Sequence, residues 1–166
     1  LTLALGDALS VALLEQKSFT AKDFSIYHPG GKLGQQLLCV TEIMHKDAAM
    51  PVLPQDVSTA EAFAEMGAKS LGCVGLVDDA GVLTGIITDG DIRRHVSPDL
   101  LDKKASDIMT KTPMTIKADT LVGEAMGIMN DVENKNRKIT CLFVLDDEKH
   151  PIGLLHLHDC LKAGFS

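Results

Sequence analysis

Residues 77–91 read VDDAGVLTGIITDGD, and residues 145–159, which lie 68 positions further on, read LDDEKHPIGLLHLHD. Both stretches place an apolar residue before an Asp-Asp pair, then a glycine followed by two apolar residues, and end on an aspartate. Apolar runs on each side of a polar turn indicate a β-hairpin, and an aspartate after a strand is typical of a helix start. The sequence therefore contains one hairpin-and-helix pattern twice.

The duplication extends upstream of these two stretches. Ile43-Met44 returns as Ile108-Met109 at a spacing of 65. Four further residues return at a spacing of 63, namely Asp56, Glu61, Ala62 and Met66 as Asp119, Glu124, Ala125 and Met129. The spacing between equivalent residues changes from 63 to 68, which places an insertion in the polar residues 130–138. This polar stretch predicts a widened loop. Each copy is predicted to be a β-α-β-β-α unit, and neither is expected to fold alone.

The apolar periodicity gives approximate bounds for the elements. In the first copy we expect a strand at 51–54, a helix that Asp56 or Ser58 caps and that ends near Ala68, and strands at 74–77 and 82–87. In the second copy we expect strands at 114–116, 140–145 and 152–157, and a helix at 121–130. Residues 1–16 predict a helix that is apolar on nearly every side, which is typical of the interior of a larger core.

Composition and charge limit the class of protein. The 166 residues are 45% hydrophobic and 23% charged, which is typical of a globular chain. A net charge of −7 argues against nucleic acid or an anionic membrane as a partner, so a phosphate ligand needs a local group of donors. Four cysteines without a C-x-x-C pair favour reduced thiols and a cytoplasmic location. Asp7 and Ser10 interrupt the apolar residues 1–14, which predicts neither a signal nor an anchor. The first residue is Leu, which predicts a piece of a longer protein.

The duplicated pattern closely resembles a pair of CBS domains from about Val40 to the end of the chain. Upstream, LALGDA at residues 3–8 and FSIYHPGGKLG at residues 24–34 resemble the end of a sugar isomerase (SIS) domain. With TDGDIRR at 88–94 and HLHD at 156–159, the whole chain resembles bacterial arabinose-5-phosphate isomerases. The fold that this resemblance implies is α/β: an SIS remnant at residues 1–39, then CBS repeats at 40–98 and 99–166 about a pseudo-twofold axis.

The resemblance also implies a parent enzyme. That enzyme interconverts D-arabinose 5-phosphate and D-ribulose 5-phosphate in Kdo and lipopolysaccharide synthesis, although related isomerases act in capsule or sugar-alcohol pathways. His28 matches the family's His-Pro-Gly-Gly motif, and a histidine can move a proton near neutral pH. From the residues alone, a turn histidine with a surface hydrogen bond is the favoured interpretation of His28, and the catalytic role applies to the parent enzyme. Because the other catalytic groups of the family lie upstream, this chain by itself is expected to be inactive.

The stretch GIITDGD at residues 85–91 suits a nucleotide. A buried strand would deliver the Thr88 hydroxyl and the N–H groups of a helix start towards a phosphate, while Asp91 accepts the ribose hydroxyls. The alternative is that Thr88 and Asp91 only cap the helix. Arg93, with Arg94, Lys135, Arg137 and Lys138, can donate to phosphate or form a solvated face. Backbone groups are expected to contact the base from the two short strands, at Val52, Leu53, Thr115 and Ile116.

The second copy has His156 in place of the threonine but keeps Asp159, so one competent half-site is expected rather than two. His156, His158 and Asp159 could suggest a metal site, but a helix start is the preferred interpretation, and neither a metal nor a cofactor is predicted. The expected ligand is a nucleotide or a sugar nucleotide such as CMP-Kdo. Self-association is also expected, as a homodimer of this chain and a homo-oligomer of the parent. The alternative is a purely structural module without a ligand.

Overall fold

The computed structural model describes residues 2–19, 37–130 and 139–165, which belong to two units, 1–38 and 39–166. In the first unit, the predicted apolar helix is present as α1 (Thr2–Gln16), and its large apolar side chains are exposed, as with Leu3 at 85%. Over the described ranges, no helix is long and apolar enough to cross a membrane. The candidates His28, Lys135, Arg137 and Lys138 lie outside the described residues.

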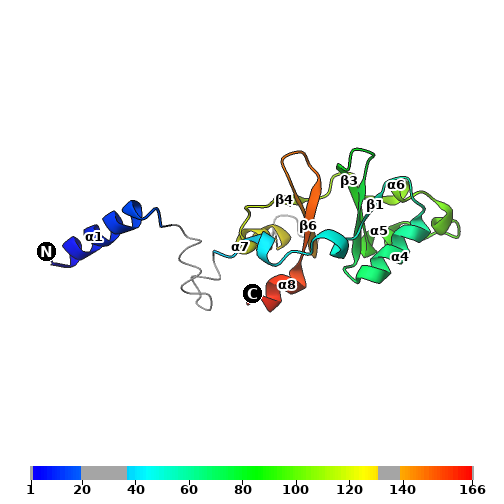
Figure 1. Ribbon diagram of the computed structural model, residues 1–166. Helices are drawn as coiled ribbons and strands as arrows, with labels where there is room; N and C mark the ends of the chain where they lie inside the picture. The colour runs from blue at the N-terminus through cyan, green and yellow to red at the C-terminus, as the bar shows by residue number, and fades with distance from the viewer. Residues whose placement is uncertain (1, 20–36, 131–138, 166) are drawn as a thin grey trace. The chain divides into compact units, whose positions relative to one another are not determined.

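The second unit contains both predicted repeats (Figure 1). The first repeat consists of the 3-10 turns η1 (Val40–Glu42) and η2 (Asp47–Ala49), then β1 (Val52–Pro54), α4 (Thr59–Lys69), β2 (Cys73–Val77), β3 (Leu83–Thr88) and α5 (Asp89–Arg94). The turn η3 (Leu100–Asp102) and the short helix α6 (Ala105–Ile108) follow. The second repeat consists of β4 (Thr115–Lys117), α7 (Val122–Met129), β5 (Cys141–Leu145), β6 (Pro151–His156) and α8 (Leu157–Lys162).

The two repeats form two three-stranded sheets with the same topology. The strand orders are β1-β2-β3 and β4-β5-β6, with the first pair of strands parallel and the second pair antiparallel in each sheet. The register shifts at the same place in both hairpins, between Leu76 and Val77 and between Val144 and Leu145. The carboxylates of Asp78 and Asp146 accept backbone N–H groups in the two hairpin turns. The duplication read from the sequence is therefore a structural repeat.

Local sequence explains where helix α4 begins. Ser58 is its N-cap: the Ser58 Oγ accepts the Glu61 N–H at 3.2 Å, and Glu61 Oε2 accepts the Ser58 N–H at 2.8 Å. This reciprocal pair satisfies two backbone donors that the first turn of a helix leaves free. Ala62 and Met66 lie one turn apart on the buried face of the helix. Ser58 therefore fulfils the cap role for which the sequence offered Asp56 and Ser58.

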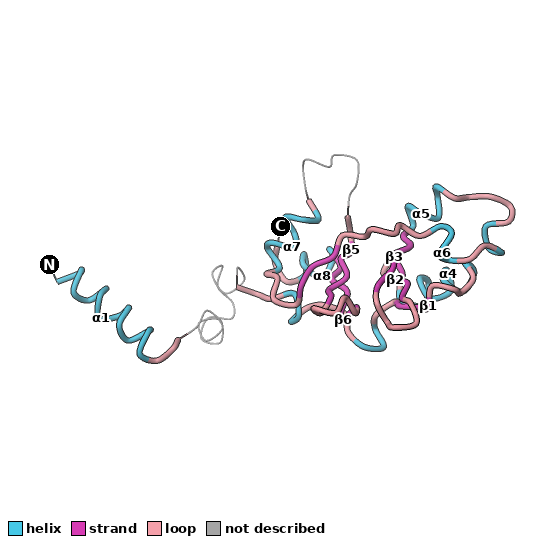
Figure 2. Tube along the Cα trace, turned by 90° about the horizontal axis from the view of Figure 1, so that it is seen from above, coloured by secondary structure: helices cyan, strands magenta, loops and turns pink. Residues whose placement is uncertain are grey.

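The sheets face each other, and the long helices lie on their outer sides (Figures 1 and 2). Alternate residues of β2 therefore enter different cores. Val74 and Leu76 pack beneath α4, while Cys73 packs against β5 and β6 of the second repeat. Gly75 also faces the second repeat, since a Cβ added there would stand 2.6 Å from the Phe143 ring. Covering both faces explains why these short strands are apolar at nearly every position.

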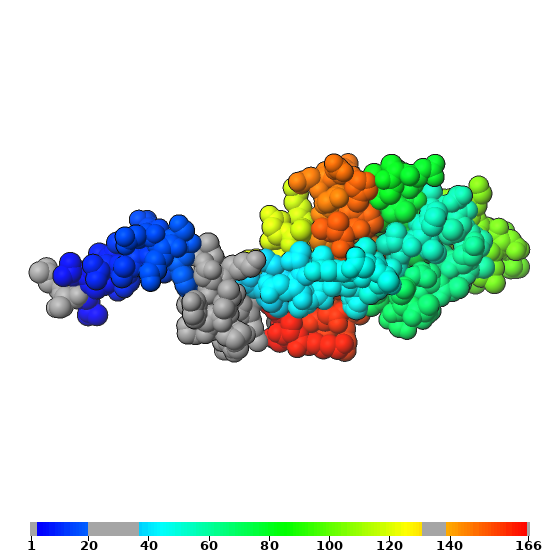
Figure 3. Space-filling view, viewed as in Figure 1, coloured from blue at the N-terminus to red at the C-terminus, as the bar shows by residue number. Residues whose placement is uncertain are grey.

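In each repeat, the stretch before the first strand extends the sheet of the other repeat. His45 exchanges two backbone hydrogen bonds of 2.9 Å with Leu154, and Thr110 exchanges two with Ile86 at 2.8 and 3.0 Å. Figure 3 shows residues 39–50, in cyan, crossing the face of the second repeat before the chain reaches β1. The hairpin turns also touch, where His150 Nε2 lies 3.1 Å from the Ala80 carbonyl. Each sheet is therefore completed by residues of the other repeat.

Candidate functional site

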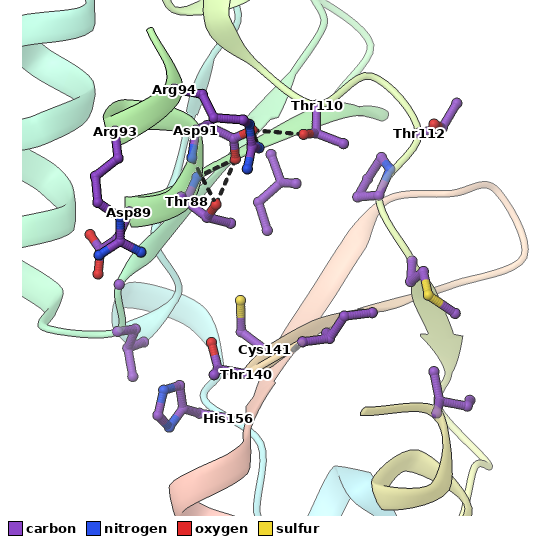
Figure 4. Close-up of a pocket in the computed structure, with 18 of the residues that line it drawn as sticks. Thr88, Asp89, Asp91, Arg93, Arg94, Thr110, Thr112, Thr140, Cys141 and His156 are labelled. Carbon is purple, nitrogen blue, oxygen red and sulfur yellow. Dashed lines mark hydrogen bonds and ion pairs between the residues drawn. The ribbon is translucent and has the colours of Figure 1, made fainter. Parts of the chain in front are cut away.

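A cavity of about 860 Å³ lies between the two repeats. Figure 4 shows its polar wall, with Thr88, Asp91, Arg93 and Arg94 on one side and Thr140 and His156 on the other. Apolar side chains from both repeats complete the lining, namely Leu71, Ile86, Met114, Ile128 and Ile139. The cavity is large enough for a small organic ligand, and it combines a few polar groups with apolar surface as ligand sites commonly do.

Asp91 is the most buried charged residue of the cavity wall, with 3% of its surface exposed. Its Oδ2 accepts the Thr88 N–H at 2.9 Å and the Thr88 hydroxyl at 2.6 Å. Its Oδ1 accepts the Thr110 hydroxyl at 2.9 Å and pairs with the guanidinium of Arg94. Thr88 Oγ1 in turn accepts the Asp91 N–H at 3.3 Å, which makes the two residues a reciprocal cap of α5. The helix cap expected as one alternative is thus present in the cavity wall.

The partners of Asp91 decide its charge state. Burial by itself raises the pKa of a carboxyl group, but hydrogen bonds from Thr88 and Thr110, together with Arg94, outweigh it here. The pKa of Asp91 is consequently below its ordinary value. At neutral pH the cavity wall carries an ionised carboxylate whose acceptor positions are filled from three residues.

This lowered pKa predicts how stability depends on pH. A carboxyl group whose pKa is lower in the folded state stabilises the fold above its unfolded pKa, and that contribution is lost as pH falls through the folded pKa. We expect the free energy of unfolding to fall below about pH 4, near the ordinary pKa of aspartate, and less steeply in Asp91→Asn. Urea unfolding of both proteins between about pH 5 and pH 3 measures this. Parallel pH profiles would show that Asp91 contributes nothing to the acid sensitivity.

The equivalent position of the second repeat has different chemistry. Asp159 Oδ2 lies 2.7 Å from His45 Nε2, and Asp159 Oδ1 lies 3.5 Å from Lys162 Nζ. Burial raises the pKa of Asp159, but His45 and Lys162 outweigh it and leave the pKa lowered. His156 replaces Thr88, and its Nδ1 accepts the His158 N–H at 3.2 Å. Burial lowers the pKa of His156, which favours the neutral ring that this hydrogen bond requires.

The structure gathers only part of the candidate residues. Thr88, Asp91, Arg93 and His156 line the cavity, whereas Asp159 pairs with His45 away from the lining. The four expected base contacts are not among the lining residues of the described chain: Val52 and Leu53 pack against the two cores, Ile116 is buried and Thr115 is exposed. The stretch before β4 does line the cavity, with Thr112, Pro113 and Met114.

Three threonines of the cavity, Thr110, Thr112 and Thr140, were not predicted from the sequence as site residues. Thr110 bonds Asp91, and Thr140 precedes β5 beside Cys141. A signal for Thr110 did exist, because Ile43-Met44-His45 aligns with Ile108-Met109-Thr110 at the spacing of 65. His45 contacts Asp159, and Thr110 contacts the equivalent Asp91. If one of these two contacts had been known, the repeat would have predicted the other.

A group of possible metal ligands lies elsewhere, in the turn between β5 and β6. One atom from each of Asp146, Glu148 and His150 falls within 4.8 Å of the others. Asp146 Oδ1 already accepts the N–H groups of Glu148 and His150, and the His150 ring lies 3.1 Å from Asp146 Oδ2 and from the Ala80 carbonyl. These contacts shape the turn and hold it against the first repeat.

Comparison with known proteins identifies the fold family. The model of the CBS domain matches residues 40–98 and again residues 105–166, which together cover more than half of the chain. This chain belongs to the CBS domain family. The cavity therefore lies between two CBS domains of one pair.

Curated relatives match the CBS pair and the segment before it. Arabinose 5-phosphate isomerase KdsD of Pseudomonas aeruginosa is 42% identical over 166 residues, and KdsD of Yersinia pestis is 40% identical over the same length. Each alignment covers 98% of this chain but 49% of the relative. The chain thus spans about half the length of the curated relatives it matches.

Solved structures share the fold of the pair. The CBS domain pair of protein MJ0100, in complex with 5′-methylthioadenosine and S-adenosyl-L-methionine, matches with a TM-score of 0.65 and 24% identity, covering 76% of this chain and 94% of that one. The protein CBSX2 of Arabidopsis thaliana, in complex with AMP, matches with a TM-score of 0.62 and 20% identity, covering 76% and 95%. The tandem CBS fold expected from the sequence is confirmed.

Proposed function

We propose that this CBS pair binds a nucleotide or a sugar nucleotide in the cavity between its repeats. The observation that carries the proposal is the division of the lining into two kinds of surface. Thr88, Asp91, Arg93 and Arg94 supply hydroxyl, carboxylate and guanidinium groups for a ribose and a phosphate. The apolar side chains of the lining, which include Met114 and Ile128, offer surface for a base. The nucleotide complexes of other CBS pairs support this assignment.

The contacts of Asp91 suggest how such a ligand enters. Arg94 pairs with Asp91 Oδ1, and its side chain is 56% exposed. A ribose hydroxyl can donate to the same oxygen, so that the ligand displaces the guanidinium and the carboxylate stays fully paired. Arg94 then becomes free to bind a phosphate oxygen beside Arg93. The free-energy cost of the exchange is small, because it leaves no buried charge without a partner.

We further propose that the pair is the regulatory and assembly module of an arabinose 5-phosphate isomerase. The similarity to KdsD over nearly the whole chain supports this, and so does the SIS-like sequence of residues 1–39, which contains His28. In this assignment catalysis needs the half of the protein that lies outside this chain. The repeats at 40–98 and 99–166 sense a metabolite, for which CMP-Kdo is one candidate, and help to hold the protein as a homo-oligomer.

Thermal unfolding with a panel of AMP, CMP, S-adenosylmethionine and CMP-Kdo tests the binding proposal. A ligand that binds only the folded state stabilises it by about 2.7 kcal/mol at one hundred times its dissociation constant. For a domain of this size, the gain corresponds to a rise in Tm of roughly 5–15 °C. We expect at least one member of the panel to cause such a rise.

Inorganic phosphate and the bases without ribose serve as controls, because each tests one part of the cavity separately. If no nucleotide raised the Tm at millimolar concentration, the binding proposal would be rejected. The alternative of a purely structural module would then be favoured.

A further inference from the structure

Cys73 and Cys141 occupy equivalent positions on the two sheets. Each is the first residue of a central strand, β2 or β5, and the two are 0% and 6% exposed. They belong to one buried cluster, together with Ile86, Phe143 and Leu154. Since β2 belongs to the first repeat and β5 to the second, the two thiols meet across the boundary between the repeats.

Neither thiol is part of a disulfide, and the two lie close enough within the shared cluster for each to shift the pKa of the other. Contact with Cys73 holds the pKa of Cys141 below its ordinary value, even though burial acts in the opposite direction. The same contact, together with burial, raises the pKa of Cys73. The thiolate is the reactive form of a cysteine, so the thiol that an oxidant can reach is the one that reacts first.

Access also distinguishes the two residues. Cys141 lines the cavity beside His156, its partner on the neighbouring strand, whereas Cys73 is not a lining residue of the described chain (Figure 4). A small oxidant in the cavity can therefore reach the Cys141 sulfur first. Cys73 belongs to the same buried cluster, within the reach of a second step.

We propose that Cys73 and Cys141 are a peroxide-sensitive pair whose oxidation links the two CBS repeats through a disulfide. In the first step, the Cys141 sulfur attacks one oxygen of hydrogen peroxide, the O–O bond breaks, and water leaves. This step makes a sulfenic acid on Cys141. In the second step, the Cys73 sulfur attacks the sulfenic sulfur, the S–O bond breaks, and a second water leaves. The two thiols lose two electrons, and the peroxide gains them.

The crosslink would close a long loop between β2 and β5, which restricts the unfolded chain and stabilises the fold. It would also fix the spacing of the two sheets at the wall of the cavity. This inference does not depend on the proposed function, because neither step requires a nucleotide.

The wild-type chain provides the first test. After treatment with hydrogen peroxide, the protein is denatured in excess alkylating reagent, digested and analysed by mass spectrometry. We expect a peptide pair crosslinked through Cys73 and Cys141, and a rise in Tm on the order of 10 °C that dithiothreitol reverses. The partly exposed Cys39 is an internal reference for ordinary thiol reactivity. Oxidation of Cys39 while Cys73 and Cys141 remain free thiols would overturn the proposal.

Two variants test the order of the steps. The chain with Cys39→Ser and Cys160→Ala retains only the proposed pair, and it should form the same crosslink within one chain. In Cys73→Ser the second thiol is missing, so the sulfenic acid on Cys141 should persist and react with a dimedone probe. Crosslinks between different chains in the first variant, or a folded Cys73→Ser protein without a probe adduct on Cys141, would contradict the mechanism.

Discussion

Replacing Phe143 with alanine is expected to lower the free energy of unfolding of the CBS pair by about 3–5 kcal/mol. Phe143 is fully buried and lies between the sheets, with its ring over Gly75 of the first repeat. The substitution removes apolar burial and leaves a cavity that two rigid sheets cannot easily close. Urea unfolding of both proteins measures the loss.

Phe165→Ala is the matched control, because the same side chain is removed from a partly exposed position near Gly123. It should cost about 1 kcal/mol, as expected for a residue that already contacts water. Similar losses from the two substitutions would show that the interface between the sheets contributes no more than the surface of the pair. In that case the two repeats would not share one core.

Asp91→Ala is expected to lower the free energy of unfolding by about 2–3 kcal/mol at neutral pH. The substitution leaves the Thr88 N–H and the Thr110 hydroxyl without their acceptor, and it removes the partner of Arg94. Arg94 is half exposed, so its charge can return to water and the cost stays below that of a fully buried ion pair.

Asp159→Ala is the internal control for this prediction, since it changes the equivalent aspartate of the second repeat. Asp159 is 21% exposed and pairs with His45 and Lys162, so its loss should cost about 1 kcal/mol. Chemical denaturation of the two variants at pH 7 makes the comparison. Equal losses would contradict the asymmetry that the structure shows between the repeats.

The fold could be predicted from the sequence because the same sequence pattern occurs in both repeats. Three features recur at a fixed spacing: the Asp-Asp turn, the glycine followed by two apolar residues, and the aspartate at the helix start. Each of them corresponds to one local structure. The helix cap at Ser58 is similarly local, as a capping pair separated by three residues. Such short-range patterns can be recognised without knowledge of tertiary contacts.

The cavity was harder to predict because long-range contacts form it. Thr110 reaches Asp91 only because the stretch before β4 crosses to the first sheet. Backbone groups of the short strands β1 and β4 were expected to contact the base; these strands are not part of the described lining, and the expectation stays a prediction. The contact between Cys73 and Cys141 likewise depends on how the two sheets face each other, which no spacing within one repeat encodes.

Titration calorimetry tests the central claim, that one nucleotide binds in the cavity at the half-site of Thr88 and Asp91. The ligand is the panel member that raises the Tm most, and the proteins are wild type, Asp91→Asn and Asp159→Asn. We expect one site per chain. Asp91→Asn should lower the affinity by roughly 5- to 150-fold, which is equivalent to about 1–3 kcal/mol for an unpaired ribose hydroxyl. Asp159→Asn should cause a smaller loss of affinity. Unchanged affinity in a folded Asp91→Asn protein, or equal losses in both variants, would contradict the assignment.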